Sequence, residues 1–181
     1  MSTFSPEAVL EGSEPSSPIE KARASLAKNP RQMTMILARQ LELSEAEVIR
    51  ALPDERSTAL SMDSWDDLMA ALENLGEVHV IVSNGTTTIE SVGSFGGFSS
   101  GGGFFNVQSG TLDMHIRPAS IVSAYAVRKP SHFDGNETLS IQFFDMRGTA
   151  AFKVFLTFGG SAPSREKEAQ FAALVREFQT A

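Results

Sequence analysis

The amino-acid sequence predicts an α+β fold, in which short helices precede a large, mostly antiparallel β-sheet and one further helix follows it. Apolar residues recur at helical spacing up to about residue 76, at strand spacing from residue 77 to residue 158, and at helical spacing again after residue 164. Short turns, and no helical pattern, separate the strand-like segments, as is typical of antiparallel strands. We therefore expect a single domain at residues 18–181, with a helical part at 18–76, the sheet at 77–158 and a last helix at 164–179.

Composition separates residues 1–17 from the rest of the chain. This segment holds five serines, three glutamates and two prolines, but no lysine or arginine, and it has too little apolar surface to order itself. The whole chain of 181 residues is 41% hydrophobic and 20% charged, which is typical of a globular domain. We expect a flexible tail at 1–17 ahead of the folded domain.

The charge and the cysteine content exclude several classes of protein. A net charge of −7 speaks against a general nucleic-acid binder, which would be basic. The absence of cysteine excludes disulfides, thiolate metal sites and thiol nucleophiles. No apolar run reaches the roughly 18 residues of a membrane span, and the first residues lack the pattern of a secretory signal. We expect a cytoplasmic protein that contacts neither membrane nor nucleic acid.

Capping residues mark three helices in the N-terminal part. Pro18 opens the first helix, which we expect to extend to about residue 28. The Asn29-Pro30 pair predicts the start of a second helix, and Ser44 with Glu47 forms a capping box for a third. Two short helices joined by a tight turn have the outline of a helix-turn-helix, or of a helical cap on the main domain. The acidic third helix favours the cap, because a helix that reads a DNA groove needs donors such as arginine.

The remaining elements follow from periodicity and turn residues. A fourth helix is expected from Asp63 to a stop at Gly76, and Asn84-Gly85 predicts a hairpin between strands at 78–83 and 86–92. Further strands are expected at 103–107, 112–117, 121–128, 138–144 and 150–158. Ser164 caps the last helix, whose apolar stripe should cover one face of the sheet.

A candidate binding segment spans residues 93–130. It begins rich in glycine and aromatic residues, crosses Phe104 and Phe105, and then places His115 and Arg117 two residues apart on one strand, hence on one face. Such residues could form a slot for a flat, apolar, anionic molecule. The alternative interpretation is a bulged, half-buried sheet in which the histidine is structural.

Haem matches this set of residues better than zinc, phosphate or a sugar does. It needs an apolar slot, an axial ligand for iron and cations for two propionates. The axial candidates are His115, His79, Tyr125 and His132. The propionate candidates are Arg117, Arg128 and Lys129. His115 is the preferred iron ligand, because it alone shares a face with a basic residue. Without cysteine, haem b would be held non-covalently.

Several short motifs occur in the order and spacing of a known family. They are LGEV at 75–78, GFFNV at 103–107, LDMHIR at 112–117, VRKP at 127–130, and FFD with FKV at 143–145 and 152–154. Over roughly residues 22–178 the chain resembles the intracellular haem-utilisation proteins of the HutX/ChuX type, and more distantly each half of the HemS/ChuS-type proteins. Where many members of the family carry tyrosine or histidine, this chain has glycines and phenylalanines at 101–105.

The resemblance implies a homodimer that binds haem in a cleft beside a sheet of seven or more strands. It implies a cytoplasmic carrier or store of haem in haem uptake and iron utilisation, which hands its haem to a degrading enzyme. Two alternatives stay open at this point. One is that the protein itself degrades haem with oxygen, and the other is a ligand-free regulatory module that uses the helix-turn-helix outline.

Overall fold

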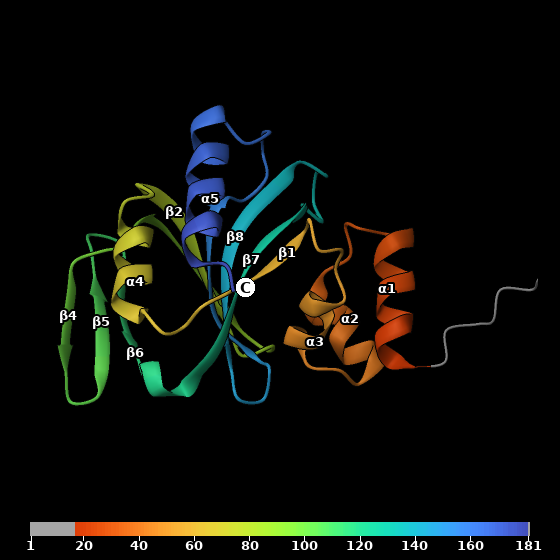
Figure 1. Cartoon of the computed structure of the whole chain (residues 1–181), viewed down its shortest axis with the longest axis horizontal. Coiled ribbons are helices and arrows are strands. Elements are labelled where there is room, and N and C mark those ends of the chain that lie inside the picture. Colours follow the sequence, from red (N-terminus) through yellow and green to blue (C-terminus); the bar gives the residue numbers. More distant parts are fainter. Residues whose placement is uncertain (1–16, 181) are drawn as a thin grey trace, which may run out of the picture.

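The computed structural model describes residues 17–180, and the predicted tail at 1–17 therefore lies outside the described residues except for Ser17 (Figure 1). The five helices within this range are α1 (Pro18–Lys28), α2 (Thr34–Leu41), α3 (Glu45–Arg50), α4 (Trp65–Glu73) and α5 (Arg165–Phe178). The strands are β1 (Ser57–Leu60), β2 (Glu77–Ser83), β3 (Thr88–Ser94), β4 (Phe98–Gly101), β5 (Phe104–Gln108), β6 (Asp113–Ile116), β7 (Ile121–Pro130), β8 (Glu137–Asp145) and β9 (Ala150–Thr157). A 3-10 turn, Pro118–Ser120, precedes β7.

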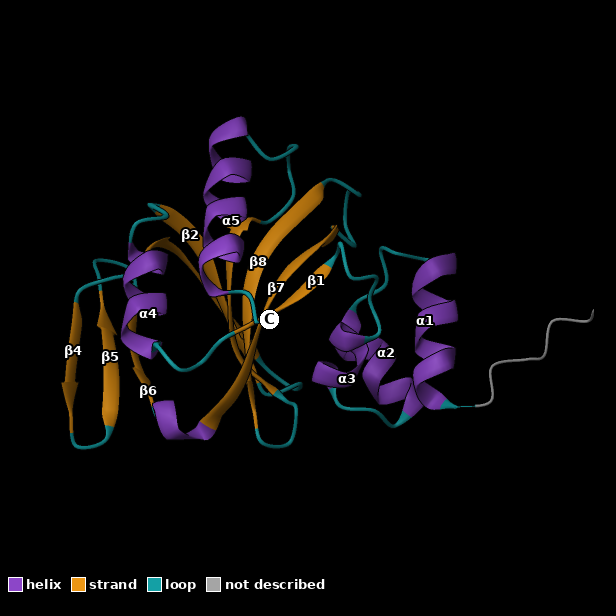
Figure 2. Cartoon of the chain, viewed as in Figure 1, coloured by secondary structure: helices purple, strands orange, loops and turns teal. Residues whose placement is uncertain are grey.

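Two antiparallel sheets contain these strands (Figure 2). The larger sheet has six strands in the order β1-β7-β8-β9-β2-β3, and the smaller has three in the order β4-β5-β6. Every strand pairing that the described residues make is antiparallel. The predicted α+β class is confirmed, but the expected seven or more strands are divided between two sheets.

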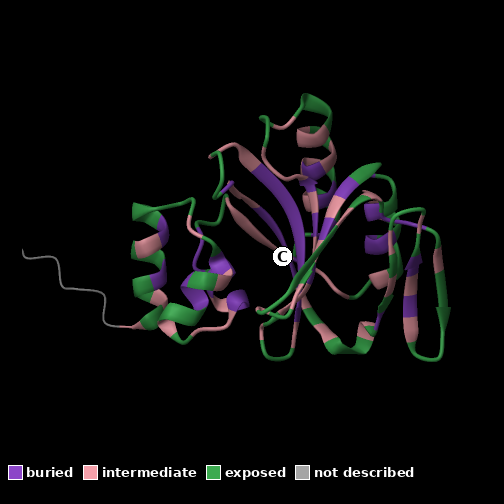
Figure 3. Ribbon diagram, turned by 180° about the vertical axis from the view of Figure 1, so that it is seen from behind, coloured by how far each residue is buried: buried purple, intermediate pink, exposed green. Residues whose placement is uncertain are grey.

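Alternating side chains divide the six-stranded sheet between two cores. On β7, Ala124 and Ala126 face the first core, whereas Tyr125 and Val127 face the second. The first core fills the space between the sheet, α4, α5 and the inner face of the small sheet. The second core joins α1, α2 and α3 to the opposite face. Helices therefore cover both faces of the sheet, and its central strands are buried (Figure 3).

Capping residues in the sequence predicted the starts of most helices correctly. Ser17 and Ser44 each accept a hydrogen bond from the backbone three residues on, and Glu20 and Glu47 complete the two capping boxes. The side chain of Ser164 accepts a hydrogen bond from the backbone nitrogen of Lys167 and so caps α5. The predicted start of the second helix at Asn29 is wrong, because Asn29 is the C-cap of α1 and the helix begins only at Thr34.

Two strands were missed in the sequence. β1 lies inside the part expected to be helical, where its four residues pair with β7 and its free edge receives the C-terminal segment through hydrogen bonds at Ser61 and Thr180. β4 contains Ser99, Ser100 and Gly101, which have low strand propensity. Both strands are four residues long and owe their conformation to a neighbouring strand.

The N-terminal helices serve as a cap on the sheet. Ala46, Val48 and Ile49 of α3 are buried in the second core, and Glu45 of the same helix is also buried. A recognition helix must present an exposed face to a DNA groove. In α3 most of the six residues are turned inward, which favours the predicted cap over a helix-turn-helix reader. Among the described residues, no helix is long and apolar enough to cross a membrane.

Gly97, in the turn before β4, lies very close to the backbone of β5. A Cβ at this position would be 2.0 Å from the carbonyl oxygen of Gln108, and the residue has a φ of +70°. Gly102 also has a positive φ, +60°, but nothing lies within 4 Å of its would-be Cβ. We expect Gly102→Ala to cost about 1 kcal/mol of unfolding free energy for the left-handed conformation. Gly97→Ala should cost at least about 1 kcal/mol more, because two backbones must separate.

Urea unfolding of both variants measures this difference. Equal costs would show that β5 yields to the added methyl group without strain.

Candidate functional site

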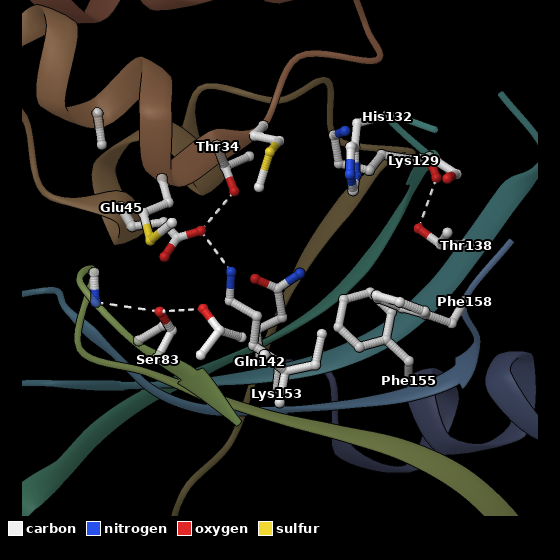
Figure 4. A pocket seen from close by; sticks show the side chains of 18 of the residues that line it. Thr34, Glu45, Ser83, Lys129, His132, Thr138, Gln142, Lys153, Phe155 and Phe158 are labelled. Atoms are coloured by element: carbon white, nitrogen blue, oxygen red, sulfur yellow. Dashed lines mark hydrogen bonds and ion pairs between the residues drawn. The ribbon is translucent and has the colours of Figure 1, made fainter. Parts of the chain in front are cut away.

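A cavity of about 720 Å³ lies on the face of the large sheet opposite α4 and α5 (Figure 4). Its walls come from α2 and α3, from the hairpin between β2 and β3, from the loop between β7 and β8, and from the strands themselves. The volume is within the range of small-molecule and cofactor sites. The cavity forms because the three N-terminal helices pack against one end of this face and leave the rest of it uncovered.

The floor of the cavity is unusually polar for the middle of a sheet. Thr138 and Gln142 of β8 and Lys153 of β9 face it, together with Phe155. Their strand neighbours on the other face are apolar and form the first core. Alternation along the strands thus places one apolar face against α5 and one polar face under the cavity.

A buried ion pair connects the helices to this floor. The Nζ of Lys153 lies 2.6 Å from a carboxylate oxygen of Glu45, and the same oxygen accepts a hydrogen bond of 2.6 Å from the hydroxyl of Thr34. Glu45 is 8% exposed. Figure 4 shows this chain of contacts crossing from α2 and α3 to β9. It fixes one side of the cavity and leaves Lys153 with an acidic partner.

Lys129, in contrast, reaches the cavity without an acidic partner. Its Nζ donates to the carbonyl oxygen of Pro130 at 3.1 Å, and none of the described carboxylates forms an ion pair with it. Burial, followed by the positive charges of Lys153 and Arg56, lowers the pKa of Lys129 to about 8. An anionic ligand that entered the cavity would offset both effects, because its negative charge stabilises the charged form of Lys129.

Gln142 offers a second unused polar group. The residue is 4% exposed, its side-chain nitrogen donates to the hydroxyl of Ser140, and its buried Oε1 has no hydrogen-bond partner. A buried acceptor left unpaired costs free energy. Its position on the cavity floor suits a donor supplied by a ligand or by ligand-bound water.

The opposite side of the cavity carries soft and nitrogen donors. Met33 and Met35 come from the start of α2, and His132 comes from the loop between β7 and β8. Phe155 and Phe158 provide an aromatic wall, with their ring centroids 4.8 Å apart. The two rings meet edge to face, at 76°. The cavity thus combines an aromatic wall, cations and groups that can coordinate a metal in one space.

The structure brings three of the predicted site residues together, but away from the cavity. Phe104 and His115 lie on the small sheet and Arg117 directly follows β6, and the Arg117 guanidinium is 4.7 Å from the centre of the Phe104 ring. The Nδ1 of His115 is 2.7 Å from the side-chain oxygen of Asn106, and the histidine side chain is 57% exposed. They form an open surface cluster.

The other predicted residues lie on both sides of the large sheet, on its own strands or in the core packed against it. Phe105 belongs to the first core, where its ring packs edge-on against Trp65. Tyr125 is buried in the second core against Phe144. Arg128 faces α5 and forms a bidentate ion pair with Glu168. Of the predicted site residues other than the alternative ligand His132, Lys129 alone lines the cavity.

Sequence reasoning missed the polar floor, although a signal for it was present. Gln142 and Lys153 each stand between large apolar residues in their strands. Glutamine and lysine are rare in a fully buried strand, so their presence indicates that one face of these strands is not packed in an apolar core. Glu45 could not have been found in this way, because its burial depends on a contact 108 residues away.

Comparison with known proteins gives the chain its family. A sequence model of the family "Haem utilisation ChuX/HutX" matches residues 58–174. The intracellular heme transport protein HutX of Vibrio cholerae is 26% identical over 133 residues, which cover 72% of this chain and 68% of HutX. The hemin transport protein HmuS of Yersinia pestis is 30% identical over 132 residues, but these cover only 37% of its length.

A solved structure supports the same relationship. The crystal structure of a protein from Erwinia carotovora superposes with a TM-score of 0.79 at 26% identity, covering 87% of this chain and 98% of that one. The family match covers more than half of the chain and includes all of the strands except the first residue of β1. This chain belongs to the ChuX/HutX family of haem-utilisation proteins.

Proposed function

We propose that this protein binds haem reversibly in the cavity beside the large sheet and carries or stores it in the cytoplasm. One observation supports this most strongly: a single cavity in a member of a haem-utilisation family holds aromatic side chains, a lysine without an acidic partner, and histidine and methionine side chains that can coordinate iron. HutX, whose name describes intracellular haem transport, supports a carrier.

The residues of the cavity fit haem b chemically. Phe155 and Phe158 would contact the macrocycle, and Lys129, which has no acidic partner among the described residues, would meet a propionate. Histidine and methionine are both established axial ligands of haem iron. Because the chain has no cysteine, the haem would be held by these contacts alone.

From the family resemblance, we also propose that the protein is a homodimer and that it passes its haem to a haem-degrading enzyme. The sequence-based alternative places haem at the small sheet, with His115 as the ligand and Arg117 and Phe104 beside it. Hemin binding by variants of His115 and of the cavity residues distinguishes these two positions.

Titration of the protein with hemin, followed by absorbance, tests the proposal. We expect saturable binding with a shifted Soret band and a stoichiometry of one haem per chain. Adding ascorbate under air with catalase then separates a carrier from an enzyme, since a carrier keeps its Soret band and an enzyme loses it with release of iron. No saturable shift would sink the proposal and favour a ligand-free module.

The charge on Lys129 predicts how hemin binding depends on pH. With a pKa of about 8, Lys129 is mostly charged at pH 7 and mostly neutral at pH 9. Lys129→Gln should weaken hemin binding about tenfold at pH 7, because a charge-assisted hydrogen bond to a propionate is lost. The ratio of variant to wild-type dissociation constants should fall towards one as the pH rises above 8.

Lys21→Gln, which removes an exposed lysine of α1, is the matched control. A ratio that stays the same from pH 7 to pH 9 would contradict the role of Lys129.

The lowered pKa of Lys129 also affects the stability of the protein without ligand. Between about pH 8 and the ordinary lysine value of 10.5, the unfolded chain binds the proton of this lysine more tightly than the folded chain does. The contribution of Lys129 to stability should therefore rise with pH in this window.

A further inference from the structure

We propose that His132 is the axial ligand of the haem iron, and that Arg31 holds the loop that presents it. This inference rests on the proposed function, and it assigns the ligand to a residue of the loop between β7 and β8.

The three histidines of this chain differ in what their rings contact. The Nε2 of His79 lies 2.9 Å from a carboxylate oxygen of Glu90, and its ring packs against Phe158. His115 is hydrogen-bonded to Asn106 on the small sheet. His132 lines the cavity, and its ring makes no hydrogen bond or ion pair with any described residue. It is therefore the histidine whose nitrogens are free to coordinate a ligand inside the cavity.

The loop that carries His132 is closely held by its own hydrogen bonds. The backbone nitrogen of Ser131 donates to the carbonyl of Asn136 at 2.7 Å, and the nitrogen of Gly135 donates to the carbonyl of Ser131 at 3.0 Å. The side chain of Ser131 accepts from the nitrogen of Phe133 at 3.2 Å. These contacts give the backbone around His132 one defined course, as an axial ligand requires.

Asp134 fastens the loop to the connection between β9 and α5. Its carboxylate accepts from the backbone nitrogens of Asn136 and Gly160. The first contact lies within the loop, and the second holds the loop against the segment that follows β9.

Arg31 holds the same loop from the side of the helices. One guanidinium nitrogen, Nη2, donates to the carbonyl oxygen of His132 at 3.0 Å and to that of Phe133 at 2.8 Å. Arg31 lies in the connection between α1 and α2, just before the methionines that line the cavity. The contact therefore sets the position of His132 relative to α2. In Figure 4, His132 lies at the same end of the view as Lys129, above the sheet floor.

Hemin titrations of His132→Ala, His115→Ala and Arg31→Gln test this assignment. We expect His132→Ala to lose the absorbance and electron paramagnetic resonance signature of histidine-ligated ferric iron. Adding free imidazole should restore that signature, a rescue that a merely structural defect would not show. His115→Ala should keep the wild-type spectrum and affinity.

Arg31→Gln tests the positioning role. It should weaken hemin binding about tenfold, as loss of an outer contact to a metal ligand does, and give a mixture of ligated and unligated spectra. Arg23→Gln, at an exposed arginine of α1, is the control and should match wild type.

The outcomes separate the two levels of the proposal. If wild-type protein binds no hemin, the proposed function fails. If it binds hemin and His132→Ala keeps the histidine signature, the function stands and the assignment of His132 is overturned. Loss of the signature in His115→Ala alone would move the site to the small sheet. A wild-type spectrum and affinity in Arg31→Gln would overturn the role of Arg31.

Discussion

Replacing Phe143 with alanine should lower the unfolding free energy by about 3–5 kcal/mol, one of the two largest single-residue effects that we expect in this chain. Phe143 is 0% exposed in the first core. Its ring stacks on Phe152 with centroids 4.4 Å apart, and it packs edge to face with Trp65, with centroids 6.0 Å apart. The cavity that alanine leaves cannot collapse, because both neighbouring rings are fixed on other elements.

Phe133→Ala is the matched control, because it removes the same group from a side chain that is 85% exposed. Its cost should stay within about 0.5 kcal/mol, as for most surface substitutions. Chemical unfolding in urea, monitored by circular dichroism, measures both variants. Similar costs for the two variants would show that the first core does not hold the sheet to α4 and α5 in the way described.

Breaking the ion pair between Glu45 and Lys153 should have the second large effect. Glu45→Gln leaves a lysine that is 17% exposed without its partner at 2.6 Å, and it weakens the acceptor of the Thr34 hydroxyl. Removing one partner of a buried pair costs about 3 kcal/mol or more, since an uncompensated charge stays in a low-dielectric site. The loss should also loosen the attachment of α2 and α3 to the sheet.

A second ion pair in the same protein provides the comparison. Arg56 and Glu137 are 2.9 Å apart, but their side chains are 31% and 29% exposed, so Glu137→Gln should cost about 1 kcal/mol or less. The double variant Glu45→Met with Lys153→Met should recover much of the loss, because no charge then remains buried. If Glu45→Gln costs no more than Glu137→Gln, the buried pair does not join the helices to the sheet.

The site shows how far sequence reasoning extends before tertiary contacts are needed. Alternation along β7 correctly implies that Arg128 and Lys129 point to opposite faces, but it cannot say which face holds a cavity. That choice depends on where α5 and the N-terminal helices pack. Glu168 of α5 forms an ion pair with Arg128 on one face, and the N-terminal helices leave the cavity beside Lys129 on the other. Residues expected to act together are therefore separated by the thickness of a sheet.

The local elements were encoded in nearby residues. Capping boxes at Ser17 and Ser44, the cap at Ser164 and the change from helical to strand periodicity depend on contacts within a few positions, so the sequence by itself determined the α+β class and most helix and strand positions. Motif order also pointed to the haem-utilisation family. These signals are short-range in sequence and therefore readable without a structure.

Only the tertiary structure decided the division into two sheets, the short strands β1 and β4, and the composition of the cavity. Each depends on contacts between distant segments. β1 pairs with β7, Glu45 forms an ion pair with Lys153, and Arg31 donates a hydrogen bond to the carbonyl of His132, 101 positions away in the sequence. Such contacts form because buried charges and unpaired backbone groups must find partners wherever the fold brings one within reach. The sequence contains the partners, but their pairing follows from the packing of the helices on the sheet.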